Sequence, residues 1–227
     1  MAITARTATT NSSASASSLT ITTPASLADG DVVVIIACVG GGTALADVAS
    51  TNFTTICQVS NGSSIRLAYL RKVITNAAGE PASYTVTWGG TSRAVGLIGE
   101  AYVGVDNTQP EDVYGVARTG NGQTVSSNAN GVTTATDNAW LLFLEGLQNA
   151  TAIFSTPAGF TEEAQIGGSA VHLSDFAKTP AGNSGVISET ITGGVSKNWA
   201  SILIALRVSG SAPNPGFMTP RSRTWGA

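Results

Sequence analysis

The chain has 227 residues, enough for one large domain or two small ones with a core that needs no disulfide staples. Charged residues make up only 11% of it and the net charge is −3, so no clustered positive surface is expected for nucleic acid or anionic lipid. No apolar stretch approaches the ~18 residues that a membrane helix needs. Nucleic acid and membrane are therefore excluded as main partners, and the composition favours a β protein with many turns.

Strand signals dominate along the whole chain. Runs of β-branched, aromatic and aliphatic residues are separated by clusters of Gly, Asn, Asp, Ser and Pro, and no comparable window carries a 3.6-residue apolar stripe. The runs at 31–39 and 139–144 are expected to be central strands buried on both faces. The predicted strands cover residues 18–23, 31–39, 53–59, 64–73, 83–88, 93–105, 113–118, 122–126, 139–147, 160–166, 169–177, 186–192 and 198–208.

An internal repeat relates two halves of the chain, at about 28–106 and 132–208. Residues 30–37 correspond to 137–144, and the spacing between matched positions stays between 105 and 107 along both halves. We therefore predict an all-β fold: an antiparallel two-sheet sandwich, jelly-roll-like, built from an internal duplication in which each half contributes strands to both sheets. A parallel α/β fold would need crossover helices, and the sequence shows none.

The predicted β-sandwich domain spans residues 18–208, with an extended arm on either side. Residues 1–17 are mostly Ala, Ser, Thr and Asn and would not bury enough surface to become ordered alone. Residues 209–227 carry three prolines, two arginines and a near-terminal tryptophan. We expect both arms to pack against neighbouring chains.

Few residues suggest a chemistry. Cys38 and Cys57 lie in apolar or alternating runs, which favours buried free thiols over a disulfide. His172 is the only histidine, and its three-residue separation from Asp175 on a strand places the two side chains on opposite faces, which argues against a Ser-His-Asp triad. One histidine and two separated cysteines are a poor zinc ligand set. We predict no catalytic residues, no cofactor and no metal site.

Acidic residues leave two alternatives open. The loop at 106–112 is the best calcium candidate because it concentrates oxygen ligands, although a solvated turn in which Asp106 bonds its own backbone is favoured. Glu100 and Glu145 each interrupt an apolar run, so each is expected to have a raised pKa or a partner. A glycoside hydrolase would require these two carboxylates to meet in one cleft.

The first half resembles a known structural module. The residues that carry the resemblance are Gly-Asp at 30–31, Phe-Thr at 53–54, Leu-Arg-Lys-Val at 70–73, the run EPASYTVTW at 80–88 and AYVGVD at 101–106. This set resembles a β-sandwich module common in tailed-bacteriophage virion proteins, mainly over residues 28–112, and the second half echoes it through the repeat. The family is associated with capsid decoration, head fibres, and tail or receptor-binding parts, and the resemblance supplies no catalytic residues.

The resemblance implies a virion structural protein made in the host cytoplasm, with the capsid surface favoured over the tail. We expect a capsid decoration protein that binds the major capsid protein or other virion proteins and forms a homo-oligomer, with a trimer favoured. The predicted partner-binding residues lie in the C-terminal arm: Phe217, Arg221, Arg223 and Trp225, with Trp225 as an apolar anchor and the arginines facing carboxylates of a neighbour.

The alternative is a tail-fibre module that binds a receptor or carbohydrate, including a host-surface glycan. It predicts a sugar-binding face with exposed Trp88, Tyr102 or Trp199.

Overall fold

The computed structural model describes residues 2–42, 45–126, 131–148, 153–167, 170–192 and 197–211. Regular structure in these residues is β apart from 3-10 conformation at Gly42 and at Ala77–Gly79, and every strand pair is antiparallel. Among the same residues, no helix has the length and apolarity that crossing a bilayer requires. The predicted all-β antiparallel sandwich is confirmed.

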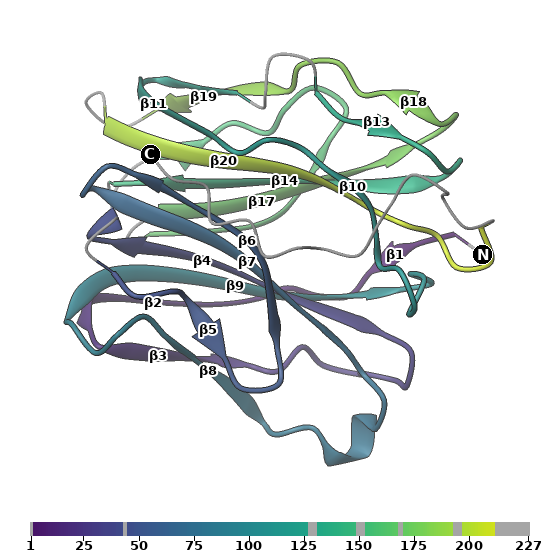
Figure 1. Cartoon of the computed structure of the whole chain (residues 1–227), viewed down its shortest axis with the longest axis horizontal. Helices are drawn as coiled ribbons and strands as arrows, with labels where there is room; N and C mark the ends of the chain where they lie inside the picture. The colour runs from purple at the N-terminus through teal and green to yellow at the C-terminus, as the bar shows by residue number, and fades with distance from the viewer. Residues whose placement is uncertain are drawn as a thin grey trace.

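Two large sheets form the centre of the molecule (Figure 1). The first has the order β1-β9-β4-β7-β6, with β2 also paired to β9. Its strands are β1 (Thr4–Ala5), β2 (Thr9–Ala16), β4 (Val32–Gly40), β6 (Thr54–Asn61), β7 (Ile65–Val73) and β9 (Arg93–Val103).

The second large sheet has the order β10-β20-β14-β17-β16, with β11 also paired to β20. Its strands are β10 (Glu111–Tyr114), β11 (Arg118–Gly122), β14 (Ala139–Leu147), β16 (Thr161–Ile166), β17 (Ala170–Lys178) and β20 (Lys197–Leu206).

Smaller sheets cover the outward faces of the large ones, which gives the layered arrangement in Figure 1. The first outer sheet is β3 (Ser18–Thr22), β8 (Ser83–Thr87) and β5 (Ala49–Ser50). The second outer sheet is β12 (Thr124–Ser126), β19 (Ser188–Thr192) and β15 (Ile153–Phe154). A further pair joins β13 (Thr133–Thr134) to β18 (Gly182–Asn183).

Side chains of β4 alternate between two cores, as successive residues of a strand must. Val32 and Val34 face the second large sheet, whereas Val33 and Ile35 face the first outer sheet, and all four are fully buried. Burying each such side chain is worth about 1.5–3 kcal/mol relative to leaving it exposed. The unbroken apolar run at 31–39 is therefore a central strand buried on both faces, as predicted.

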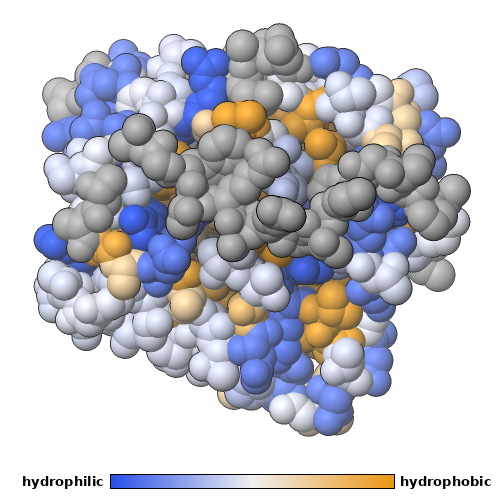
Figure 2. All heavy atoms as spheres, in the orientation of Figure 1, coloured by the Kyte–Doolittle hydropathy of each residue, from blue (hydrophilic) through white to orange (hydrophobic). Residues whose placement is uncertain are grey.

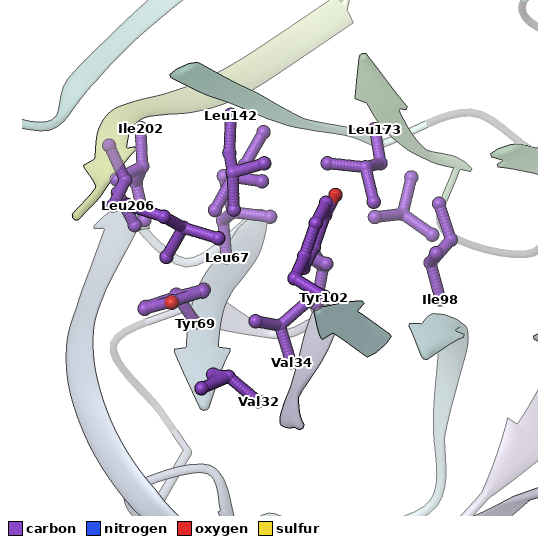
Figure 3. Packing of buried hydrophobic residues seen from close by; sticks show 14 of the residues in the cluster. Val32, Val34, Leu67, Tyr69, Ile98, Tyr102, Leu142, Leu173, Ile202 and Leu206 are labelled. Atoms are coloured by element: carbon purple, nitrogen blue, oxygen red, sulfur yellow. The ribbon is translucent and has the colours of Figure 1, made fainter. Parts of the chain in front are cut away.

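The core between the two large sheets is drawn in Figure 3. Val34, Ile98 and Tyr102 come from the first large sheet, and Leu142 and Leu173 come from the second. The Tyr102 ring stands among these aliphatic side chains with its hydroxyl directed toward the second sheet (Figure 3). The two sheets thus meet face to face across one continuous apolar layer.

The two large sheets share strand order and register. The order β9-β4-β7-β6 recurs as β20-β14-β17-β16. On β4, Ile35 pairs with Leu70, and 106 positions later Leu141 pairs with Phe176; the pairings of β4 with β9 and of β14 with β20 repeat in the same way. This is the pattern that an internal duplication would leave, while the duplication itself stays a prediction.

Contacts between the large sheets come in matching pairs. The central strands β4 and β14 pack on each other, β9 packs on β17 while β20 packs on β7, and β2 packs on β16 while β11 packs on β6. Such an exchange of roles characterises an isologous interface, in which an approximate two-fold axis relates the partners. The chain is therefore arranged as two sandwich units, residues 4–103 and 111–206, joined like a dimer within one polypeptide.

Two details of the predicted sandwich were wrong. The halves do not share the large sheets: the first sheet uses only strands from residues 4–103 and the second only strands from 111–206. Consecutive strands pair locally, which keeps each half together. The repeat alignment also slips by one residue on the central strand, because the register places Val33 rather than Val32 in the position of Ala139.

The predicted N-terminal arm is part of the first large sheet. Residues 4–16 form β1 and β2, which pair with β9, and Ile3 is buried in the central core. Thr9 and Asn11 also donate side-chain hydrogen bonds to the carbonyls of Thr22 and Thr20. Main-chain pairing to an existing sheet edge needs no large apolar side chains, which is why this segment is ordered on its own chain. Of the C-terminal arm, residues 212–227 lie outside the described residues.

The surface is mainly hydrophilic on the face shown in Figure 2, with small separate apolar areas. Among the described residues, the exposed large apolar side chains are few: Val116, Ile153, Phe176 and Val186. Single exposed apolar residues of this kind are normal on a protein surface.

Candidate functional site

Two groups of ionisable side chains lie in the interior, on opposite faces of the second large sheet. The first, called here the histidine cluster, consists of Glu145, His172 and Glu189. The second, the acidic cluster, consists of Glu100, Glu163 and Asp175. In each cluster one possible ligand atom from every member lies within 4.8 Å of the others.

The histidine cluster lies between the second large sheet and the second outer sheet. Glu145 on β14 and His172 on β17 are directly paired across the strands, and Glu189 approaches from β19. The Nδ1 atom of His172 lies 2.8 Å from Glu145 Oε2 and 3.3 Å from Glu189 Oε2, and all three side chains are fully buried. The Phe154 ring stacks on the imidazole with centroids 5.3 Å apart, which fixes the plane of the ring.

Burial and mutual contact shift the titration of this cluster. Burial alone would lower the pKa of His172, but its hydrogen bond with Glu145 and the close approach of the Glu189 carboxylate raise it to about 10. Burial, followed by repulsion from Glu189, raises the pKa of Glu145 well above its ordinary value. Burial likewise raises the pKa of Glu189. Without another cation, the raised pKa values therefore keep protons bound to the cluster, which reduces its negative charge.

The acidic cluster lies at the interface between the two units. Glu100 comes from β9 of the first unit, whereas Glu163 and Asp175 come from β16 and β17 of the second. The Tyr102 hydroxyl is 2.9 Å from Glu100 Oε2 and 3.3 Å from Asp175 Oδ2. Trp140 Nε1 donates to Asp175 Oδ2 at 2.7 Å. The neutral donors Tyr102 and Trp140 thus hydrogen-bond to the carboxylates of Glu100 and Asp175, which face one another.

Crowding of carboxylates raises two pKa values in the acidic cluster. Burial, followed by the charge of Glu163, raises the pKa of Glu100 to about 10. Burial also raises the pKa of Asp175 to about 7, against the hydrogen bond from Trp140 that lowers it. At neutral pH, Glu100 is therefore a neutral carboxylic acid.

Glu100 and Glu145 do not share a cleft. Each is fully buried and each has a raised pKa, as predicted. Glu100 faces the core between the large sheets, however, while Glu145 faces the second outer sheet, so the body of the second large sheet separates the two. The paired-carboxylate arrangement of a glycoside hydrolase is therefore wrong for these two residues. His172 and Asp175 also lie on opposite faces of β17, as their spacing predicted.

The aromatic residues proposed for sugar stacking are core residues. Trp88 and Tyr102 are fully buried, and Trp199 is 5% exposed. Trp88 packs under the first outer sheet, and the Trp199 ring is held close to Gly120 of the neighbouring strand. The predicted exposed sugar-binding face made of these three residues is wrong, because their rings complete the cores instead.

The loop at 106–112 is a turn tied by its own backbone. Asp106 Oδ1 accepts hydrogen bonds from the Thr108 and Gln109 amides at 2.8 and 3.1 Å, which confirms the predicted Asp106 turn. Glu111 instead approaches Arg71 Nε at 3.2 Å, and Asp112 Oδ2 accepts from backbone amides at 135 and 136. The acidic side chains of the loop therefore diverge rather than converge on one cation.

The predicted partner-binding residues Phe217, Arg221, Arg223 and Trp225 lie outside the described residues. An open depression of about 410 Å³ is lined by residues 135–138 and 208–211.

The prediction from sequence missed the way in which Glu189 and Glu163 join these clusters. The signal for Glu189 was present: in the alternating run at 188–192 it occupies the inward phase shared with Ile191. An acidic residue at an inward position of a strand needs a partner, and His172 is the only histidine in the chain. Glu163 had no such signal, because a register shift between Glu162 and Ala164 interrupts the alternation of β16.

Cys38 and Cys57 do not form a disulfide, as predicted; Cys38 is buried and Cys57 is half-buried. A Cβ atom on Gly146 would lie 2.7 Å from Cys38 Sγ, so the opposite sheet closes over that sulfur. Burial, followed by the charge of Glu111, raises the pKa of Cys57 to about 12.

We therefore expect neither thiol to react readily with an aromatic disulfide reagent at pH 8 in the native protein, because the thiolate is the reactive form. Two thiols should be titrated after unfolding in guanidinium. Rapid native reaction of either thiol would contradict this description of the core.

Comparison with protein-family models, with curated proteins and with solved structures finds no match to this chain.

Proposed function

We propose that this protein is a structural component of a tailed-bacteriophage virion, acting as a capsid decoration protein that binds the major capsid protein and stabilises or ornaments the particle. The observation that carries the proposal is the location of its ionisable clusters. Of the six possible ligand residues in the two clusters found among the described residues, five are buried in a layered β block and Glu163 is half-buried, so little of either cluster is accessible to a substrate. The resemblance of residues 28–112 to virion sandwich modules supplies the setting.

The mechanical properties of the fold suit a building block. Continuous cores run from one outer sheet through both large sheets to the other outer sheet. Polar contacts add ties between the units: Asn61 Nδ2 donates to the carbonyls of Gly120 and Trp199 at 2.7 and 2.9 Å, and Asn198 Nδ2 donates to Ser64 Oγ. Interiors packed in this way have low compressibility and transmit load.

Attachment to the particle is assigned to the C-terminal segment, with Trp225 as apolar anchor and Arg221 and Arg223 paired with carboxylates of the capsid protein. A homo-oligomer, with a trimer favoured, would present several such segments together and gain avidity from them. Localisation is tested by mass spectrometry of gradient-purified particles. The chain should band with the heads in a fixed ratio to the major capsid protein, and its absence from particles would refute the proposal.

Deleting residues 212–227 should abolish binding to heads while leaving the unfolding temperature within about 2 °C of the full chain, because every described strand ends before residue 212. Binding is measured by co-sedimentation with heads that lack the protein, and folding by circular dichroism.

A matched control keeps the segment and replaces only Arg221 and Arg223 with glutamine, which should weaken binding in a salt-dependent manner. Full binding by the deletion variant would reject attachment through the C-terminal segment, whereas particle localisation is tested separately by mass spectrometry.

A further inference from the structure

We propose that Glu145, His172 and Glu189 form a binding site for one divalent transition metal of the zinc type, which staples the second outer sheet to the second large sheet. The proposal does not depend on the function proposed above. It rests on the donor set, on polar atoms left without partners, and on the distances between them.

The first argument is a shortage of hydrogen-bond donors for the buried carboxylate oxygens. Nδ1 of His172 faces oxygens of both Glu145 and Glu189, yet an imidazole nitrogen carries at most one proton and donates it along one direction. The nearer oxygen, Glu145 Oε2 at 2.8 Å, takes the hydrogen-bonding contact with Nδ1, which leaves none for Glu189. Both oxygens of Glu189 and Oε1 of Glu145 are buried without a hydrogen-bond partner. Leaving such groups unpaired is costly, whereas a single cation contacts all three side chains at once.

The second argument is geometric. Zinc binds histidine nitrogen and carboxylate oxygen at about 2.0–2.2 Å in tetrahedral sites, which places neighbouring ligand atoms about 3.4 Å apart. The 3.3 Å separation of Nδ1 and Glu189 Oε2 already matches this spacing. The 2.8 Å separation of Nδ1 and Glu145 Oε2 has to open by about 0.6 Å. A small rotation of the Glu145 carboxylate, whose Oε1 has no hydrogen-bond partner to lose, provides this adjustment.

The surroundings of His172 are those of a metal ligand. With Nδ1 on the metal, Nε2 carries the proton, and Nε2 is buried without a hydrogen-bond partner. Glu162 Oε2 lies 3.7 Å from it, on the side of the ring away from the other two glutamates. Carboxylates commonly occupy this position behind a metal-bound histidine, where they orient the ring and increase its basicity. The Glu162 side chain is 42% exposed, whereas the three proposed ligand side chains are fully buried.

The donor set selects the class of metal. Calcium takes six to eight oxygen ligands, and magnesium keeps most of its waters, so neither suits a dry site with one imidazole and two carboxylates. Imidazole with carboxylate suits zinc, and cobalt(II) and manganese(II) fit the same ligands. The fourth position would take a water or a second oxygen of one glutamate.

The site belongs to one unit only. The matching positions of the first unit are Val39 on β4, Arg66 on β7 and Tyr84 on β8. Val39 and Tyr84 are core residues there, and Arg66 donates to the Ala46 carbonyl and to Ser60 Oγ. The first unit therefore closes its outer core with apolar packing where the second has the histidine cluster, so loss of metal should loosen the two units unequally.

The acidic cluster is the less suitable of the two. Glu100 Oε2 and Asp175 Oδ2 already receive hydrogen bonds from Tyr102 and Trp140, Glu163 is only half-buried, and the cluster contains no imidazole. It therefore provides the matched control for a metal that is attracted only by buried carboxylates.

The test uses the full chain, stripped with a chelator and then incubated with zinc chloride and desalted. Elemental analysis should find one zinc per chain, and cobalt(II) should give the intense visible absorption of a four-coordinate site. At zinc 100-fold above its dissociation constant, the unfolding temperature should rise by about 5–10 °C. Hydrogen exchange should slow in β12, β15 and β19 but not in β3, β5 and β8.

Three variants decide the assignment. Glu189→Gln should lose zinc and the temperature shift, and its metal-free form should be at least as stable as wild type because a buried charge without a partner is removed. His172→Ala should also lose zinc, and if it fails to fold, Glu189→Gln still decides the matter. Glu163→Gln, from the acidic cluster, should keep one zinc per chain. Substoichiometric zinc in the wild type, unchanged zinc binding in Glu189→Gln, or loss of zinc in Glu163→Gln would each overturn the proposal.

Discussion

Replacing Ile36 with alanine should lower the free energy of unfolding by about 2–5 kcal/mol, and replacing Leu142 should do the same. The two residues occupy matching places on β4 and β14 and are fully or almost fully buried in the core between the large sheets. Truncation of either removes apolar contacts and leaves a cavity at the centre of the interface, where neither sheet can collapse without disturbing the other. The loss is measured by guanidinium denaturation followed by circular dichroism.

The same pair tests whether the two units unfold together. Because β4 and β14 pack on each other, the double variant should show a coupling energy of at least about 0.5 kcal/mol, and each single variant should retain one cooperative transition. Val116→Ala, at a side chain that is 56% exposed, is the control and should stay within about 0.5 kcal/mol of wild type. Two separate transitions, with each substitution affecting only one, would contradict a shared core.

Replacing Glu100 with glutamine should stabilise the protein at alkaline pH and reduce the dependence of its stability on pH. The pKa of Glu100 is about 10 and that of Asp175 about 7 in the folded state, both above the ordinary values of about 4 that they regain on unfolding. Between these limits the folded protein holds more protons than the unfolded chain, so the free energy of unfolding falls as pH rises. Glutamine removes the Glu100 part of this penalty and keeps an oxygen acceptor for the Tyr102 hydroxyl.

The expected gain for Glu100→Gln is about 1–3 kcal/mol at pH 8, shrinking toward pH 5. It is read from guanidinium unfolding at several pH values. Asp47→Asn is the matched control, because it removes a carboxylate whose side chain is 70% exposed and should change stability by less than about 0.5 kcal/mol. Equal or lower stability of Glu100→Gln at pH 8 would show that the carboxyl group is not held neutral by the fold.

Most strands could be predicted from the sequence because they coincide with runs of apolar side chains. The apolar runs that form β4, β7, β14 and β20 are long and bounded by turn residues, and the strands begin and end close to the predicted limits. Strand β2 could not be predicted, because its sequence, TTNSSASA, has no apolar alternation. It is ordered by main-chain pairing to β9. The order of the sheet layers could not be predicted either, because alternation shows that a side chain is buried but not which sheet covers it.

The candidate site was predicted only in fragments. Glu100 and Glu145 could be recognised as buried carboxylates because each interrupts an apolar strand. The grouping of Glu145 with His172 and Glu189 depends on the pairing of β14 with β17 and on how the outer sheet lies over them. Those are long-range contacts, and a sequence repeat does not reveal them because the first unit has Val39, Arg66 and Tyr84 in the same places.

The approximate two-fold axis has a consequence for recognition. It directs the two outer sheets away from each other, so the molecule offers two opposite faces with related backbones, as Figure 1 shows. A partner that read only main-chain shape would bind both faces and be cross-linked by each copy of the protein. Exposed side chains break this equivalence, for example where β5 has Ala49 and β15 has Ile153 at the matching register position. Divergence between the halves is thus what gives a symmetric scaffold a distinguishable inner and outer side.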